Sequence, residues 1–168
     1  MADTIEVVDR GRLIAFSFED LMRYHGPTSP GGVAHAFKVL ERALPLLDPD
    51  GPCERREIVV ETAFGGPGAR DAFEMVTRAV TGDRYRVDLA LARPERGRTL
   101  ERFVFRLGYR DARTTLVLRD GFVTEEFIDL ARTPTRTPDQ ERRLDALKAE
   151  LAERVLARPA SAVYDVLR

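Results

Sequence analysis

The chain has 168 residues, which is the usual size of one domain and enough to bury its own core. Hydrophobic residues make up 43% and charged residues 33%, a globular balance, and no apolar run approaches the ~20 residues of a membrane-spanning helix. The 27 basic and 28 acidic residues give a net charge of −1, which argues against a nucleic-acid-binding protein because such proteins usually carry a basic excess.

The first 16 residues predict a short hairpin or N-terminal extension, with strands over 5–8 and 13–16 and a turn at 9–11. Their acidic start lacks the basic and apolar regions of a signal peptide, so we expect a cytoplasmic protein. Ser17, with Asp20 three residues later, forms a shortened capping box that starts a helix ending by Gly26.

A second helix begins at Ser29 and Pro30, and we expect Pro45 to end it. Its apolar face recurs at helical spacing in Val33, Phe37, Leu40 and Leu44. The segment 57–62 predicts a strand buried on both faces. A glycine-rich turn then leads into a third helix from about Ala69 to Val80.

Three strands are predicted next, over 87–91, 103–109 and 116–118, because apolar and polar residues alternate there. The capping box of Thr137 and Gln140 starts a long helix, and a short segment over 161–167 closes the chain. The apolar stripe of the long helix indicates either a core face or a homodimer seam: Leu144, Leu147, Leu151 and Val155. These elements predict one α+β domain over residues 1–168, with helices packed on a mostly antiparallel sheet.

Histidine and cysteine are scarce. Cys53 is the only cysteine, which excludes an intramolecular disulfide and all multi-cysteine metal motifs, and we expect it to be structural or incidental. The histidines are His25 and His35, so a site built from these residue types has at most three such ligands. His35 lies off the apolar stripe of its helix, so we expect it at the surface or in an interface.

The run from Phe18 to Gly32, FEDLMRYHGPTSPGG, resembles the N-terminal signature of the FmdE family, which takes its name from a component of formylmethanofuran dehydrogenase. Four later segments follow the order of that family, and the resemblance covers residues 17–168: Val59–Thr62, the helix start at Asp71–Phe73 with 77–82, Phe103–Phe105, and Leu156–Val166. The resemblance implies an FmdE-like fold with a cleft near the signature.

The resemblance also implies metal binding through histidine and cysteine, but most of those positions differ in this chain. His25 matches the first histidine of the signature, whereas Pro27 replaces the second and Ser29 replaces the cysteine. Ala79 stands where the family has another cysteine, and the turn 63–70 contains none. A divalent metal ion would therefore depend on His25.

His25 is the principal candidate for chemistry, with Tyr24 beside it. Imidazole titrates near neutrality, so His25 could act as a general acid or base or as a single metal ligand. The alternative is a histidine at a helix end that bonds to the backbone. A nearby carboxylate would orient the ring, and we favour Glu61 over Asp71, since Asp71 also suits the positive end of a helix.

Thr28, Ser29, Gly31 and Gly32 open the second helix, where free amides and the helix dipole favour an anion. The alternative role for these residues is a capped, tightly packed helix start. The glycine turn 64–70 could form the opposite wall of a cleft, with Arg70 as a carboxylate partner. It matches neither the G-x-G-x-x-G nor the P-loop pattern, so nucleotide binding is not indicated.

Three functions follow as expectations. The first is an FmdE-like protein that binds or acts on an anionic small molecule in a cleft, with His25 as general acid or base and Glu61 nearby. The second is a divalent-metal-binding accessory protein related to molybdenum or tungsten formylmethanofuran dehydrogenase. The third is a non-catalytic ligand-binding or assembly subunit. The partners expected are a small molecule and a second copy of the chain, without nucleic acid or membrane.

Overall fold

The N-terminal hairpin is present and belongs to the folded domain. In the computed structural model, which describes residues 3–168, β1 (Thr4–Asp9) pairs antiparallel with β2 (Arg12–Ser17). The connecting Arg10 and Gly11 have φ angles of 53° and 80°, the left-handed pair of a turn whose twist suits a two-residue hairpin. The hairpin contributes three side chains to the hydrophobic core: Ile5, Val7 and Phe16.

The main sheet has five strands in the order β4-β3-β5-β6-β7. Only β3 and β4 run parallel, and the other neighbours are antiparallel, which confirms the mostly antiparallel α+β architecture predicted from the sequence. The strands are β3 (Ile58–Thr62), β4 (Tyr85–Val87), β5 (Val104–Tyr109), β6 (Ala112–Leu118) and β7 (Tyr164–Val166).

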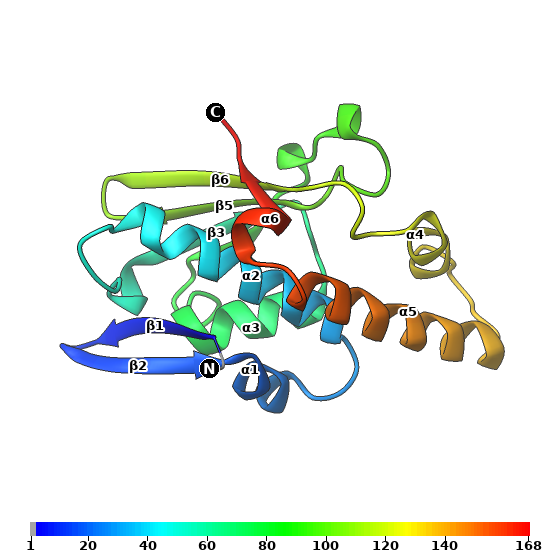
Figure 1. Ribbon diagram of the computed structural model, residues 1–168, viewed down its shortest axis with the longest axis horizontal. Coiled ribbons are helices and arrows are strands. Elements are labelled where there is room, and N and C mark those ends of the chain that lie inside the picture. Colours follow the sequence, from blue (N-terminus) through cyan, green and yellow to red (C-terminus); the bar gives the residue numbers. More distant parts are fainter. Residues whose placement is uncertain (1–2) are drawn as a thin grey trace.

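The helices pack mainly on one side of this sheet, and Figure 1 shows α2 and α3 between the sheet above and the hairpin below. Helix α5 begins near α4 at the far end of the molecule and runs toward α6, packing against α2. The helices are α1 (Phe18–His25), α2 (Pro30–Leu47), α3 (Pro67–Thr77), α4 (Glu125–Ala131), α5 (Pro138–Leu156) and α6 (Ala160–Val163). Short 3-10 turns cover 55–57, 89–91 and 94–96.

Helix α2 is the centre of the domain. It contacts α1, α3, α5, α6 and the sheet, so side chains all around its axis are buried. This surrounding overturns the expectation for His35, which is fully buried although it lies off the apolar stripe. The helix also passes Pro45 and ends at Leu47, because the buried side chain of Leu47 keeps the last turn against the core.

Two predicted strands differ from the structure. Strand β3 buries one face, since Ile58, Val60 and Thr62 are buried while the residues between them are partly exposed on the open side of the sheet. The predicted strand over 87–91 is the end of β4 followed by a 3-10 turn, in which Val87 is 46% and Leu89 63% exposed. Its alternation is therefore not a core pattern. Helix α4 and strand β7 were not predicted.

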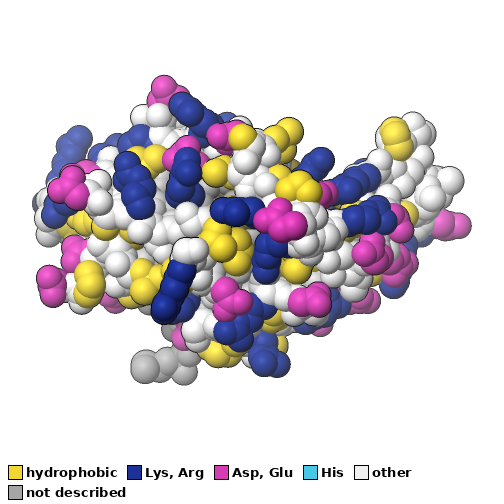
Figure 2. Space-filling view, turned by 90° about the horizontal axis from the view of Figure 1, so that it is seen from above, with side chains coloured by type: hydrophobic (Ala, Val, Ile, Leu, Met, Phe, Trp, Pro, Cys, Tyr) yellow, Lys and Arg dark blue, Asp and Glu magenta, His cyan; other side chains and the backbone are white. Residues whose placement is uncertain are grey.

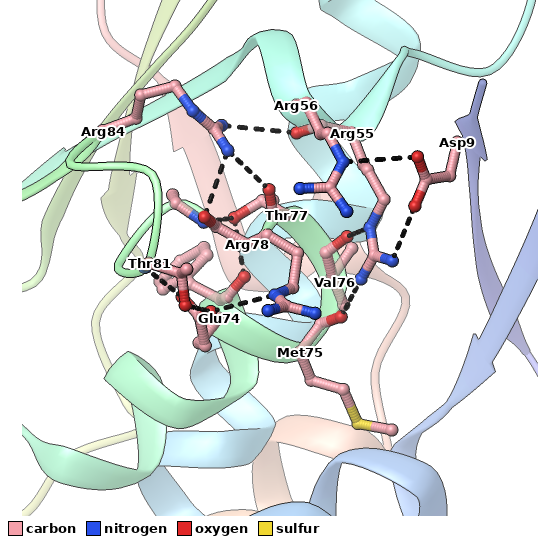
Figure 3. A network of polar contacts seen from close by, with 12 residues as sticks. Asp9, Arg55, Arg56, Glu74, Met75, Val76, Thr77, Arg78, Thr81 and Arg84 are labelled. Carbon is pink, nitrogen blue, oxygen red and sulfur yellow. Dashed lines mark hydrogen bonds and ion pairs between the residues drawn. The ribbon is translucent and has the colours of Figure 1, made fainter.

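The C-terminal end of α3 is held by arginines (Figure 3). Arg55 Nε donates to the carbonyl of Val76 at 2.9 Å, and Arg84 Nη2 donates to that of Thr77 at 3.0 Å. Arg55 also pairs with Asp9 of the hairpin at 3.4 Å. Because cations stabilise the negative end of a helix, this network joins the hairpin to α3 and gives these arginines a structural role.

Candidate functional site

A cavity of about 420 Å³ lies where the N-termini of α2 and α3 meet, next to α4 and α5. Ser29, Gly31 and Gly32 line it from the start of α2, and the turn 64–68 lines it from the start of α3. Both helices therefore direct the positive ends of their dipoles toward one place. The segment 98–103 and the facing sides of α4 and α5 complete the wall.

Glycines bring the two helix starts together. A Cβ on Gly68 would lie 2.5 Å from the carbonyl oxygen of Ser29, and one on Gly32 would lie 3.1 Å from the amide nitrogen of Ala69. Gly31 packs closely against Leu151 of α5 in the same way. The glycines of the predicted anion site thus serve tight packing, which is the alternative role, and they also line the cavity.

Aromatic and aliphatic side chains form the apolar part of the cavity. The rings of Phe64 and Phe103 stack with centroids 4.7 Å apart and an angle of 24° between their planes. Phe127 and Ile128 of α4 and Leu151 of α5 face the same space. A ligand with a flat apolar body would therefore find matching surface here.

The charged side chains that line the cavity are all cationic: Arg98, Arg102, Arg132 and Lys148. Arg98 pairs with Asp129 at 2.7 Å, which raises the pKa of that guanidinium, and Arg132 pairs with Glu101 at 3.0 Å. Within residues 3–168, Arg102 and Lys148 have no carboxylate partner. No aspartate or glutamate of this described part lines the cavity, but Arg98 also pairs with Glu125 at 3.1 Å, so Arg102 and Lys148 are the two lining cations whose charge no salt bridge balances.

His25 lies at the end of α1, within a cluster that adjoins the cavity through the loop to α2. Its Nδ1 is 2.8 Å from Asp71 Oδ2, and its Nε2 is 3.3 Å from Thr28 Oγ1. A carboxylate only accepts hydrogen bonds, so Nδ1 carries a proton, and in the neutral imidazole Nε2 accepts from the Thr28 hydroxyl. The imidazole side chain is 5% exposed, whereas Thr28 is exposed.

The carboxylate beside His25 is therefore Asp71, and not the favoured Glu61. Glu61 lies on the open face of the sheet, where both its oxygens accept from Arg106 of the neighbouring strand at 3.2 and 3.0 Å. This pairing raises the pKa of Arg106. Asp71 lies next to His25 because α3 packs against α1, which brings the second turn of α3 to the end of α1.

The other predicted ligand-binding residues lie in the His25 cluster, at the edge of the cavity, or apart from both. Arg70 is largely exposed and lies 3.6 Å from Asp71, so it belongs to the His25 cluster and does not line the cavity. Tyr24 is 52% exposed and borders a separate hollow beside the hairpin and α3. Thr28 connects the His25 cluster to the cavity, since its hydroxyl faces His25 and its carbonyl accepts from Nζ of Lys148, a lining residue, at 3.3 Å.

Most of the cationic and aromatic lining was not predicted from the sequence. Arg98 and Arg102 lie in an irregular segment and Arg132 follows α4, which was not predicted, so no periodicity marked them. Lys148 had one usable signal, because it is one of only two lysines among 27 basic residues. Phe64 belongs to the predicted turn 64–70, but its partner Phe103 comes from the distant segment just before β5.

The described residues offer few ligands for a metal ion. Within residues 3–168, no group of three or more histidine, cysteine, aspartate or glutamate side chains could hold one. His25 has a single carboxylate neighbour, and both of its ring nitrogens already have partners. Cys53 is buried elsewhere, and burial raises the pKa of its thiol to about 11, so it offers no thiolate to a metal at neutral pH.

Comparison with known proteins leaves the site to be interpreted from its own chemistry: no family model matches this chain, and no curated protein matches it. No helix in the described part of the chain combines the length and apolar character needed to cross a membrane.

Proposed function

We propose that this chain binds an anionic small molecule with an apolar body in the cavity between the starts of α2 and α3. One observation carries the proposal: two helix N-termini and four cationic side chains meet over a stacked aromatic pair, without an acidic residue in the lining. We further propose that the scaffold is FmdE-like, as the signature around His25 indicates.

Each part of the cavity has a matching part in such a ligand. Uncapped amides at a helix start favour carboxylate or phosphate, and the Ser29 side chain makes no capping hydrogen bond to those of α2. Guanidinium groups bind the same anions in a planar, bidentate manner. The cavity volume of about 420 Å³ lies within the range of ~300–1,000 Å³ that is typical of small-molecule sites.

His25 supplies the acid–base chemistry in this proposal. Asp71 holds the proton on Nδ1, which leaves Nε2 of the neutral ring as a proton acceptor next to Thr28, one residue before Ser29 of the cavity lining. A purely ligand-binding subunit would need the cavity alone, so variants of His25 separate the enzymatic from the non-catalytic version. The metal-binding alternative has less support, because its donors would be limited to His25 and Asp71.

A cytoplasmic location and a homodimer also belong to the proposal. The stripe on α5 is not the dimer seam, because it is buried within one chain, with Leu144 2% and Leu147 4% exposed. A dimer would therefore use another surface.

Calorimetric titration with phenyl phosphate, and with benzyl alcohol as its neutral analogue, tests the proposed binding. We expect saturable binding of the phosphate only. Removing both unpaired cations, as Arg102→Ala with Lys148→Met, should weaken it by at least ~10-fold, since a hydrogen bond to a charged group contributes about 1.5–3 kcal/mol.

Arg142→Ala is the matched control, because Arg142 is 71% exposed and pairs with Asp139 at the first turn of α5. This variant should bind phenyl phosphate as the wild type does. Equal affinity in the wild type and the double variant, or no binding by the wild type, would overturn the proposal.

A further inference from the structure

We propose that Asp71, His25 and Thr28 form a catalytic triad, in which the Thr28 hydroxyl attacks an ester whose acyl part carries a negative charge. The sequence brings these residues from the end of α1, the loop before α2 and the second turn of α3. Their order in space is carboxylate, imidazole, hydroxyl, which is the arrangement that activates a hydroxyl nucleophile.

The distances fit these roles. The orienting contact between Asp71 Oδ2 and His25 Nδ1 is 2.8 Å, a short charge-assisted hydrogen bond. The contact between His25 Nε2 and Thr28 Oγ1 is 3.3 Å, slightly longer than the ~2.6–3.2 Å of a bound complex, as is common without substrate. Among residues 3–168, Thr28 is the only hydroxyl residue within hydrogen-bond distance of the His25 ring.

Burial separates the roles of the three side chains. The imidazole is 5% exposed and the Asp71 side chain 29%, while Thr28 is exposed at the surface. A substrate can therefore reach the hydroxyl, whereas the base beneath it is shielded from bulk water. A histidine with a purely structural role would not need an exposed hydroxyl on its second nitrogen.

The surrounding backbone fixes this geometry. Gly26 ends α1 with a φ of 92°, and its amide donates to the carbonyl of Met22 at 2.7 Å. The close contact between Gly68 and Ser29 ties the loop to the start of α3, one turn before Asp71. Such rigid support is what a preorganised nucleophile requires.

The reaction balances with water as the only co-reactant. Thr28 Oγ1 attacks the acyl carbon while its proton passes to His25 Nε2, and the ester C–O bond breaks as that proton passes to the leaving oxygen. Water then attacks the acyl-threonine, gives a proton to His25, and releases the acid as the Thr28 hydroxyl reforms. Asp71 stays ionised throughout.

Lys148 provides positive charge beside the reacting group. Its ammonium donates to the backbone carbonyl of Thr28 at 3.3 Å, which places one positive charge next to the loop that carries the nucleophile. The preference for an anionic acyl group rests on the proposed function, because the adjacent cavity would hold that group. The triad itself does not depend on it.

Two aryl esters test the inference: mono-4-nitrophenyl terephthalate, which is anionic, and 4-nitrophenyl 4-methylbenzoate, which is neutral. We expect the wild type to release nitrophenolate in a burst and to gain the mass of one acyl group, which peptide mapping locates on Thr28. Rates are divided by those of spontaneous hydrolysis, so that the intrinsic reactivities of the two esters cancel.

Variants separate catalysis from folding. Thr28→Val should abolish acylation, while Thr28→Ser, which keeps the hydroxyl, should retain it. His25→Gln should slow acylation by at least ~10²-fold. Thr114→Val on β6 is the control and should react as the wild type does. Melting temperatures show which variants fold. If Thr28→Val does not fold, the position of the acyl group in the wild type still identifies the nucleophile.

The outcomes distinguish this inference from the proposed function. Acylation of another residue, no acylation, or full activity in folded Thr28→Val would overturn the triad. Thr28 could react equally with both esters, and the double variant of Arg102 and Lys148 could leave the ratio of the two corrected rates unchanged. That result would support the triad and contradict the proposed anion site. A preference for the anionic ester that this double variant removes supports both.

Discussion

His25 and His35 are ten residues apart in the sequence and have opposite surroundings. His25 contacts a carboxylate and a surface hydroxyl, whereas His35 is fully buried, with Nδ1 2.7 Å from the Tyr164 hydroxyl and its ring against Phe103. The sequence identified His25 from its loop position. It did not identify the 46-residue link to Asp71, because no local pattern encodes a contact between two helix ends.

The first prediction concerns the charge of His35. Burial lowers the pKa of His35 to about 3, from an ordinary value near 6.5. Between these pH values the unfolded chain binds a proton that the folded chain does not. The contribution of His35 to the free energy of unfolding therefore falls as the pH drops through this window, by ~1.4 kcal/mol per pH unit.

Proton NMR of the His35 ring, from about pH 8 to about pH 4, checks this prediction. We expect its resonances to stay at the neutral position throughout, and the unfolding free energy of His35→Gln to depend less steeply on pH than that of the wild type. Titration of the ring near pH 6.5 in the folded protein would show that the site is not dry and apolar.

At the scale of elements, local chemistry was predictable and packing was not. The capping boxes at Ser17 and Thr137 are formed as predicted, because both partners of a capping box lie within one turn of sequence. Helix α2 continues past Pro45, and the alternation over 87–91 is exposed, because long-range packing decides both features. The same long-range packing requires glycine at the starts of α2 and α3, where the two helices approach each other closely.

The second prediction compares two glycines of one turn. Gly68→Ala places a methyl group against the carbonyl of Ser29 at the junction of α2 and α3. It should lower the free energy of unfolding by ~1–3 kcal/mol, as other overpacking substitutions do, and weaken phenyl phosphate binding. Gly65→Ala has its nearest neighbour at 3.9 Å and should change stability by less than ~0.5 kcal/mol.

Urea unfolding of both variants measures the difference. Equal stability of the two would mean that the helix starts are not in close contact, and the cavity would then lack the geometry on which the proposed function depends.

At the scale of the molecule, the α+β class and the antiparallel sheet were predictable, since periodicity and capping fix element types. The cavity was not, because distant segments assemble it: the start of α2, the turn into α3, residues 98–103, and α4 with α5. The cations of the cavity are few among the basic and acidic side chains that are interspersed over the surface, as the view in Figure 2 shows. Composition therefore gave no sign of a positive site.

The central claim is that an anion with an apolar body binds where α2 and α3 begin. Its most direct test is a two-dimensional amide NMR titration with phenyl phosphate, because glycines of the cavity and glycines elsewhere report separately. We expect saturable shifts at Gly31, Gly32, Gly66 and Gly68, and none at Gly11, Gly51 or Gly82. Shifts confined to the second set, or the absence of any shift at saturating phenyl phosphate, would contradict it.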